Sequence, residues 1–320
     1  MTNNIIFSII IPAYKQKFFK ECIDSILAQT YKYFELIIVN DDSPEDLDAI
    51  IKSYSDPRIR YYKNRKNCGA IDVVDNWNIC LSYTIGDYVI CMGDDDKLLP
   101  NCLEVYNNLI AEYPGRGIYH AWTEIIDENS QLIRTQNIRP IEEDVYSFIW
   151  HRWHGREQFI GDFLFETKRL KANGGFYKLP LAWGSDDITA VIAAKDNGII
   201  NSQIPIFQYR VNSQTISKSS NFELKLKAIN IEEDWYNNFL SKHSNDEKRL
   251  RKNREKTKKE LHQFMNKKKS VILMKDFSQN NWINRLNYWI PRKEIYKLNV
   301  NIIIYSMIKS LKLKIQNLFA

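Results

Sequence analysis

The feature that most constrains this chain is a short apolar run that ends abruptly in three carboxylates. Residues 88–91 are rich in β-branched and aromatic side chains and follow a Gly-Asp pair, which predicts a buried strand after a turn. Asp94, Asp95 and Asp96 follow after Met92 and Gly93. Adjacent carboxylates repel one another, so they need either a solvated turn or a hard divalent cation. Because ligands of open α/β sheets bind at the carboxyl ends of strands, we expect a metal–diphosphate site here.

The preceding part of the chain alternates apolar runs with helical patterns. Strands are expected at 5–11, 34–39 and 59–62, and helices at 18–29, 43–54 (with Ser43 as N-cap), 70–84 and from Pro100 to near Pro114. This order predicts an α/β fold with a doubly wound, mostly parallel sheet. No G-x-G-x-x-G follows the first strand and no Walker A loop appears, which excludes the usual dinucleotide and P-loop sites.

The second half is less regular. A hairpin is expected at 117–126 and 131–135, strands at 163–165 and 204–211, and helices at 170–175 and 188–197. After about Ser220 the pattern changes to long charged helices without strands. We therefore expect an α/β domain over residues 1–220 and a helical extension over residues 221–320.

The charge is divided unevenly between these parts. Residues 241–320 hold 20 Lys/Arg and 6 Asp/Glu, whereas residues 1–240 hold 25 and 33. A basic tail indicates an anionic partner, although the run 247–269 also fits a solvated helix face. Residues 282–320 combine Trp and Tyr with aliphatic and basic residues, which predicts amphipathic helices on an anionic membrane surface. Nucleic acid is less favoured, because the aromatic residues are not spaced for base stacking.

Cysteine usage and the N-terminus bear on location. The chain has five cysteines, an odd number, and none of them has the spacing of a zinc site. This predicts reduced core thiols in a cytosolic protein. The N-terminus has no basic region and no cleavage site, so no signal peptide is expected. No stretch of 18 apolar residues occurs, so no transmembrane helix is expected.

Two further acidic pairs could carry chemistry. Asp41 and Asp42 follow a predicted strand and could accept hydrogen bonds from a base or a ribose, or could simply form a turn. Asp186 and Asp187 precede a predicted helix and could include a general base, or could be stabilised there by the helix dipole alone. Trp183 beside them offers a flat face for a sugar ring, although a core role is the commoner one.

Taken together, these features resemble the inverting glycosyltransferases of family 2, which have a GT-A fold. The resemblance covers about residues 5–215. Each motif is weak alone, but their order along the chain is specific. The motifs are 8–14, 29–31, 35–43, 67–69, 86–89, 94–96 closing at 99–100, 174–176, 186–187 and 209–211.

The resemblance implies a role for each matching residue. Asp41 and Asp42 would hold uracil and ribose, Ala13 and Tyr14 would line the nucleotide, and Arg65 would contact its base or phosphate. Asp94 would contact the ribose or the sugar, and Asp95 with Asp96 would bind Mn²⁺ or Mg²⁺. Asp187 would be the catalytic base, and Asp186 the acid before it. Three positions depart from the family pattern. Gly93 replaces the first Asp of the D-x-D element, Asn212 replaces a His after Tyr-Arg, and Ser185-Asp186-Asp187 replaces Glu-Asp.

The expected function follows from the resemblance and the tail. It is a hexosyltransferase that moves galactose or glucose from a UDP-sugar, with inversion to a β-linkage, onto a lipid-diphosphate-linked (undecaprenyl) saccharide in O-antigen (lipopolysaccharide) or capsule biosynthesis. The enzyme would be a peripheral protein on the cytoplasmic face of a bacterial inner membrane. Its acceptor pocket would lie around His120, Trp122 and a loop at 150–154. The alternatives are a non-catalytic sugar- or nucleotide-binding scaffold of the same fold, or a nucleotidyltransferase, which would need a Gly-rich basic loop after the first strand.

Overall fold

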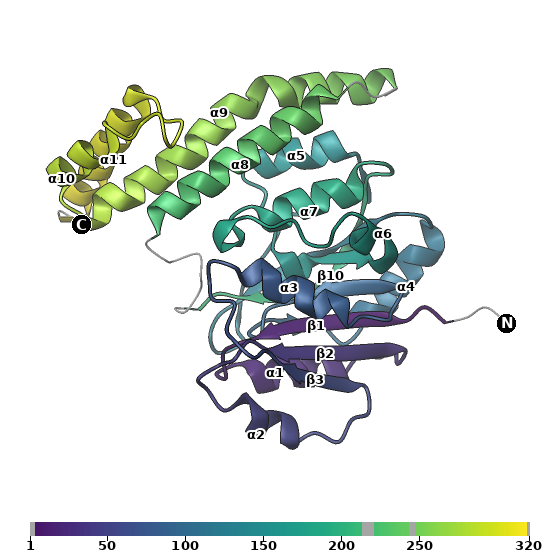
Figure 1. Cartoon of the computed structure of the whole chain (residues 1–320). Coiled ribbons are helices and arrows are strands. Elements are labelled where there is room, and N and C mark those ends of the chain that lie inside the picture. Colours follow the sequence, from purple (N-terminus) through teal and green to yellow (C-terminus); the bar gives the residue numbers. More distant parts are fainter. Residues whose placement is uncertain (1–3, 213–220, 243–246, 319–320) are drawn as a thin grey trace. The chain divides into compact units, whose positions relative to one another are not determined.

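The computed structural model describes residues 4–212, 221–242 and 247–318, and the chain divides into two compact units (Figure 1). The first unit runs to Lys178 and resumes at Ser185. The second unit contains Leu179–Gly184 and the helices of the C-terminal part. The domain boundary expected near Ser220 falls outside the described residues.

One mixed sheet organises the first unit, with strand order β3-β2-β1-β4-β9-β6-β10-β5. The strands are β1 (Phe7–Ala13), β2 (Phe34–Asn40), β3 (Ile59–Lys63), β4 (Tyr88–Cys91), β5 (Lys97–Leu98), β6 (Ile118–Ile126), β7 (Leu132–Thr135), β8 (Glu142–Glu143), β9 (Phe163–Glu166) and β10 (Ile199–Arg210). Strands β3, β2, β1 and β4 are parallel, and Figure 1 shows the first three side by side. The predicted α/β class is confirmed, but β9 lies antiparallel between β4 and β6, so the sheet is parallel mainly in its first half.

The helices of the first unit are α1 (Phe19–Leu27), α2 (Leu47–Lys52), α3 (Val73–Ser82), α4 (Cys102–Glu112), α5 (Val145–Trp153), α6 (Thr167–Ala172) and α7 (Ser185–Ala194). The predicted N-cap of α2 is wrong. Asp46 caps that helix by accepting the Ala49 N–H, whereas the Ser43 hydroxyl donates to the Tyr14 carbonyl at 2.5 Å. Helix α7 begins earlier than predicted, so Asp186 and Asp187 lie inside its first turn.

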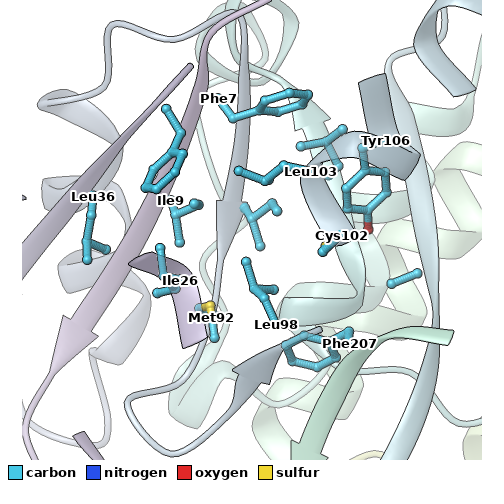
Figure 2. Close-up of a cluster of buried hydrophobic side chains, with 14 of the residues drawn as sticks. Phe7, Ile9, Ile26, Leu36, Met92, Leu98, Cys102, Leu103, Tyr106 and Phe207 are labelled. Carbon is cyan, nitrogen blue, oxygen red and sulfur yellow. The ribbon is translucent and has the colours of Figure 1, made fainter. Parts of the chain in front are cut away.

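A continuous apolar core holds β1 and β4 against helices α1 and α4 (Figure 2). Phe7 and Ile9 of β1, Ile26 of α1 and Leu103 of α4 are fully buried in it. Burying one such side chain contributes about 1.5–3 kcal/mol, so the end of β4 is firmly fixed. All five cysteines are free thiols; four of them are buried, as expected for core residues, whereas Cys68 is only partly buried.

The second unit is helical, with α8 (Phe222–Ser241), α9 (Lys248–Gln279), α10 (Trp282–Trp289) and α11 (Val300–Leu318). Helices α8 and α9 lie along each other, as Figure 1 shows, and α11 packs on α9. Two adjacent ion pairs join α8 to α9: Glu232 with Lys268 at 2.6 Å and Glu233 with Lys269 at 2.7 Å. Across the described ranges, no helix combines the length and the apolar character needed to cross a bilayer.

Candidate active site

The carboxylates that follow β2 and β4 lie at one edge of the sheet, on either side of β1. The loop after β1 joins them. The backbone N–H groups of Tyr14 and Lys15 both donate to Asp94 Oδ2 at 2.7 Å. On the other side, the Asp41 N–H donates to the carbonyl of Ala13 at 2.9 Å. The structure thus brings together the two acidic segments that follow β2 and β4.

The Asp41 carboxylate is held by the loop that follows β3. It accepts hydrogen bonds from the Asn64 side chain at 2.7 Å and from the Cys68 N–H at 3.0 Å. Burial and the charge of Asp41 raise the pKa of the Cys68 thiol to about 11, which makes this thiol a poor nucleophile. Asp42 is exposed and has a left-handed φ of 51°, so it lies at the tip of the turn. Arg65 is exposed in the loop that binds Asp41.

The three consecutive aspartates have different surroundings. Asp94 and Asp96 are buried, and burial followed by the charge of Asp95 raises the pKa of Asp94 to about 6. The same two causes raise the pKa of Asp96, whose Oδ1 accepts the Arg210 N–H at 3.0 Å. Asp95 is more open, with 16% of its side chain exposed, and its Oδ2 accepts a 2.6 Å hydrogen bond from the Asn212 amide. Asp95 is therefore the acid best placed to meet a ligand.

Gly93 has a packing reason that the sequence does not reveal. A Cβ atom at this position would lie 2.7 Å from Asp95 Oδ1 and 3.0 Å from Asp96 Oδ2. Both carboxylates therefore occupy the space beside the glycine backbone. The departure from the D-x-D pattern at Gly93 makes room for two acids and leaves the acidic turn intact.

Arg210 was overlooked as a site residue, although it belongs to a quoted motif. It is fully buried at the end of β10, and its Nε donates to the Asp95 carbonyl at 2.8 Å. Its Nη1 donates to the Asp127 carbonyl at 3.1 Å, and its Nη2 pairs with Glu21 at 3.0 Å. One guanidinium thus ties the acidic turn to the β6–β7 hairpin and to α1, and no sequence signal distinguishes such an arginine from a surface one.

The donor set fits a metal shared with a ligand. Among residues 4–212, 221–242 and 247–318, no group of three or more His, Cys, Asp or Glu could hold an ion by itself. Mg²⁺ in phosphate-handling sites commonly takes one or two carboxylates and completes its shell with phosphate oxygens and water. The Asp95 carboxylate, with Asp96 beside it, suits that arrangement.

The two candidates for the catalytic base, Asp186 and Asp187, lie in the first turn of α7. Asp187 is 3% exposed, and its Oδ1 accepts hydrogen bonds from Arg152 Nε of α5 at 2.8 Å and from Gln158 Nε2 at 2.6 Å. Asp186 is half-buried. Arg152 and Gln158 were not predicted, because nothing in a single sequence indicates that residues 29 and 35 positions away contact this turn.

Tyr209 connects the candidate base to the acidic turn. Burial raises the pKa of its phenol, and the charges of Asp96, Asp95, Asp162 and Asp186 add to that effect. The acidic turn and Asp186 therefore lie within electrostatic reach of the same side chain. The Tyr209 ring stacks on Phe159, with ring centroids 3.5 Å apart and an interplanar angle of 5°.

Two features expected near the acceptor, and the Trp183 face expected to receive a sugar, have other surroundings. His120 is buried in β6, where burial followed by the charge of Arg139 lowers its pKa to about 3, so it is neutral at physiological pH. Residues 150–153 form the end of α5 where a loop was expected, and Trp150 stacks on His154 at 3.9 Å. Lys225 Nζ lies 4.6 Å from the ring centroid of Trp183, over the face expected to receive a sugar.

Comparisons with known proteins agree on one family. A family profile described as Glycosyl transferase family 2 matches residues 8–174. An uncharacterised glycosyltransferase of Rickettsia typhi is 35% identical over 132 residues, which is 39% of each chain. WcaA of Escherichia coli, provisionally named a colanic acid biosynthesis glycosyl transferase, is 38% identical over 109 residues, or 33% of this chain and 38% of that protein. The matches thus span about two fifths of the length of these relatives.

Solved structures extend the likeness to most of the chain. TarS of S. aureus, residues 1–349 in complex with UDP-GlcNAc, matches with a TM-score of 0.65 over 98% of this chain and 92% of that one, at 14% identity. The same TarS segment in complex with UDP matches with a TM-score of 0.64 at 17% identity, over 89% of this chain and 78% of that one. The likeness shows a GT-A fold with C-terminal helices.

Proposed function

Because the chain belongs to glycosyl transferase family 2, we propose that it is an inverting hexosyltransferase that uses a UDP-sugar and a lipid-diphosphate-linked saccharide. The observation that carries this proposal is the loop after β1, which joins Asp41 and Asp94 at one edge of the sheet. The UDP-GlcNAc and UDP bound by TarS support a UDP-sugar donor. Galactose and glucose remain the expected sugars, and GlcNAc is the third to test.

The donor would bind across the two acidic segments. Asp41 and Asp42 would accept hydrogen bonds from the uridine, with Ala13, Tyr14 and Arg65 around it. Asp94 would face the ribose or the sugar, held in place by the two N–H groups that it accepts. A Mn²⁺ or Mg²⁺ ion bound by Asp95 with Asp96 would stabilise the charge that develops on the departing diphosphate.

The acid pair of α7 would take the proton. In one displacement, the acceptor hydroxyl oxygen attacks the anomeric carbon, its proton passes to a carboxylate, and UDP leaves with the bonding electrons. An α-linked donor then gives a β-linked product. The motif match favours Asp187 as this base. The Asp187 carboxylate accepts hydrogen bonds from Arg152 and Gln158, which fix its orientation, and the kinetics of variants at both positions decide between the two acids.

The second unit would bring the enzyme to its lipid-linked acceptor. Helices α10 and α11 expose Trp282, Ile283, Ile304, Tyr305, Ile308 and Leu313, and α11 also exposes Lys309, Lys312 and Lys314. Apolar and basic side chains on one short segment suit an anionic lipid surface, where each lysine contributes about 1 kcal/mol. We therefore place the protein on the cytoplasmic face of a bacterial inner membrane. The name of WcaA supports a role in surface polysaccharide synthesis, either O-antigen or capsule.

A second candidate is a non-catalytic scaffold that binds a sugar or a nucleotide. The observation in its favour is Asp187, whose carboxylate pairs with the Arg152 guanidinium at 2.8 Å. Such a protein would bind UDP and would release no UDP from a UDP-sugar.

Calorimetric titration of UDP, with Mn²⁺ and with EDTA, is the first test. We expect metal-dependent binding that Asp95→Ala abolishes and that Asp196→Ala, a change at an exposed aspartate after α7, leaves intact. UDP release from UDP-galactose, UDP-glucose and UDP-GlcNAc is then measured with a lipid-diphosphate-linked saccharide. Absence of UDP binding with both Mn²⁺ and Mg²⁺ would reject the UDP-sugar proposal, whereas binding without turnover would favour the scaffold.

A further inference from the structure

The segment Leu179–Gly184, directly before the candidate base, has an unusual backbone. Leu181 and Ala182 have left-handed φ values of 60° and 52°, and Gly184 has a φ of 95°. Side-chain-bearing residues rarely adopt this conformation, and each costs about 1–3 kcal/mol unless its surroundings hold it. Contacts within the second unit therefore hold this segment in its conformation.

Those contacts come from helix α8. The short 3-10 helix η2 (Pro180–Ala182) packs on α8, and the Lys225 ammonium lies 4.6 Å from the centre of the Trp183 ring. A Cβ atom at Gly184 would lie 3.1 Å from the Glu232 carboxylate, so backbone and carboxylate are in close contact. Glu232 is fully buried and accepts hydrogen bonds from Lys268 of α9 at 2.6 and 2.8 Å.

The next peptide bond leads into the first turn of α7. Gly184 belongs to the second unit, and Ser185, which starts α7, belongs to the first. The first turn of α7, which carries Asp186 and Asp187, therefore starts directly after the segment Leu179–Gly184, and η2 in that segment packs on α8.

We infer that Glu232, fixed by Lys268, is a positioning residue that sets the start of the turn bearing Asp186 and Asp187. This inference rests on the proposed function only for its effect on turnover. In addition to the proposed lipid binding, the helical unit then holds the segment Leu179–Gly184 that precedes the candidate base. The residue acts through Gly184 and touches no substrate.

The neighbouring ion pair provides an internal control. Glu233 pairs with Lys269 at 2.7 Å, is 8% exposed and lies between the same two helices. Lys269 also donates to the Lys297 carbonyl at 3.2 Å, and His262 lies 3.3 Å from Glu233. Glu233→Gln thus removes a similar buried charge, at a position that contacts Lys269 and His262 of α9.

Amide hydrogen–deuterium exchange on the full-length protein, without substrate, tests the positioning directly. We expect Glu232→Gln to speed exchange in peptides covering residues 183–190 by roughly tenfold or more, because local opening of this turn becomes easier. Glu233→Gln should leave these peptides unchanged. Equal exchange in both variants and the wild type would overturn the inference, whether or not the protein transfers a sugar.

Turnover gives the second readout once wild-type transfer is established. A misplacement of about 1 Å can cost roughly 100-fold in rate, so Glu232→Gln should lower kcat about 3- to 30-fold while the Kd for UDP stays unchanged. Gly184→Ala adds a Cβ atom 3.1 Å from the Glu232 carboxylate and should lower kcat in the same way. Equal kcat losses in Glu232→Gln and Glu233→Gln would mean general destabilisation and would overturn the inference. If the wild type itself releases no UDP, the proposed function fails and the exchange result still stands.

Discussion

The side-chain amide of Asn212 donates a 2.6 Å hydrogen bond to the carboxylate of Asp95. Asn212 stands where the family resemblance places a histidine, and Asp95 is the proposed metal ligand. The departure therefore puts a neutral donor on this acid, which orients one oxygen and leaves its charge in place. Support of this kind normally tunes metal affinity.

Replacing Asn212 should therefore weaken metal binding. We expect Asn212→Ala to raise the Kd for Mn²⁺, measured by calorimetry in the presence of UDP, by about 10-fold or more. Asn197→Ala, at an exposed asparagine after α7, is the matched control and should have no effect. An unchanged Kd in Asn212→Ala would mean that this hydrogen bond does not contribute to metal binding.

Substitutions of Asp186 and Asp187 should lower kcat to different extents. If Asp186 is the base, Asp186→Asn lowers kcat by about 10²- to 10⁴-fold, the contribution of a positioned base, while the Kd for UDP is unchanged. Asp187→Asn should then be milder, and Arg152→Gln should resemble it, because both change the same 2.8 Å contact. Complete loss in Asp187→Asn with near-normal turnover in Asp186→Asn would assign the base to Asp187.

His120 should make the first unit sensitive to acid. An unfolded histidine binds a proton below about pH 6.5, whereas the folded His120 has a pKa of about 3. Between these values the unfolded state holds more protons, so the free energy of unfolding falls as pH falls, by up to about 1.4 kcal/mol per pH unit.

The matched variant is His120→Gln, which cannot titrate in this range. Urea denaturation of wild type and variant from pH 7 to pH 4.5 should show a shallower decline for the variant. Carboxylate titrations are common to both proteins and cancel in the difference. Parallel pH curves would contradict the assignment of a buried neutral histidine.

Membrane binding should depend on α11. We expect the triple change Ile304→Ser, Tyr305→Ser and Ile308→Ser to reduce co-sedimentation with anionic phosphatidylglycerol vesicles by at least roughly tenfold, because about 0.8 kcal/mol is lost per buried CH₂. Ile85→Ser, at a residue 75% exposed in the first unit, is the control and should bind normally. Equal binding of the wild type to neutral and anionic vesicles would argue against the basic residues as a determinant.

The location of the acidic residues could be predicted because each follows a buried apolar run. Parallel strands place their carboxyl ends at one edge, so Asp41 and Asp94 had to be neighbours once β2, β1 and β4 were parallel. The direction of β9 could not be predicted, because an apolar run of four residues fits either orientation. Ser43 and Asp46 are both good N-caps, and the contact of Ser43 with the Tyr14 carbonyl decided between them.

The residues that hydrogen-bond to the acids could not be predicted from the sequence. Arg210 and Asn212 lie 115 and 117 positions from Asp95, and Arg152 lies 35 from Asp187. Their burial depends on tertiary packing, and arginine and asparagine side chains are normally exposed to solvent. The sequence therefore predicts where the acidic residues lie, whereas the side chains that orient them can be identified only in the folded structure.

Gly93 bears on how the acidic motif can change over evolution. Because the Asp95 and Asp96 carboxylates occupy the space where a Cβ would stand, adding the missing aspartate at position 93 would displace two acids in order to gain one. The form with glycine and the form with a first aspartate are thus alternative ways to build the turn.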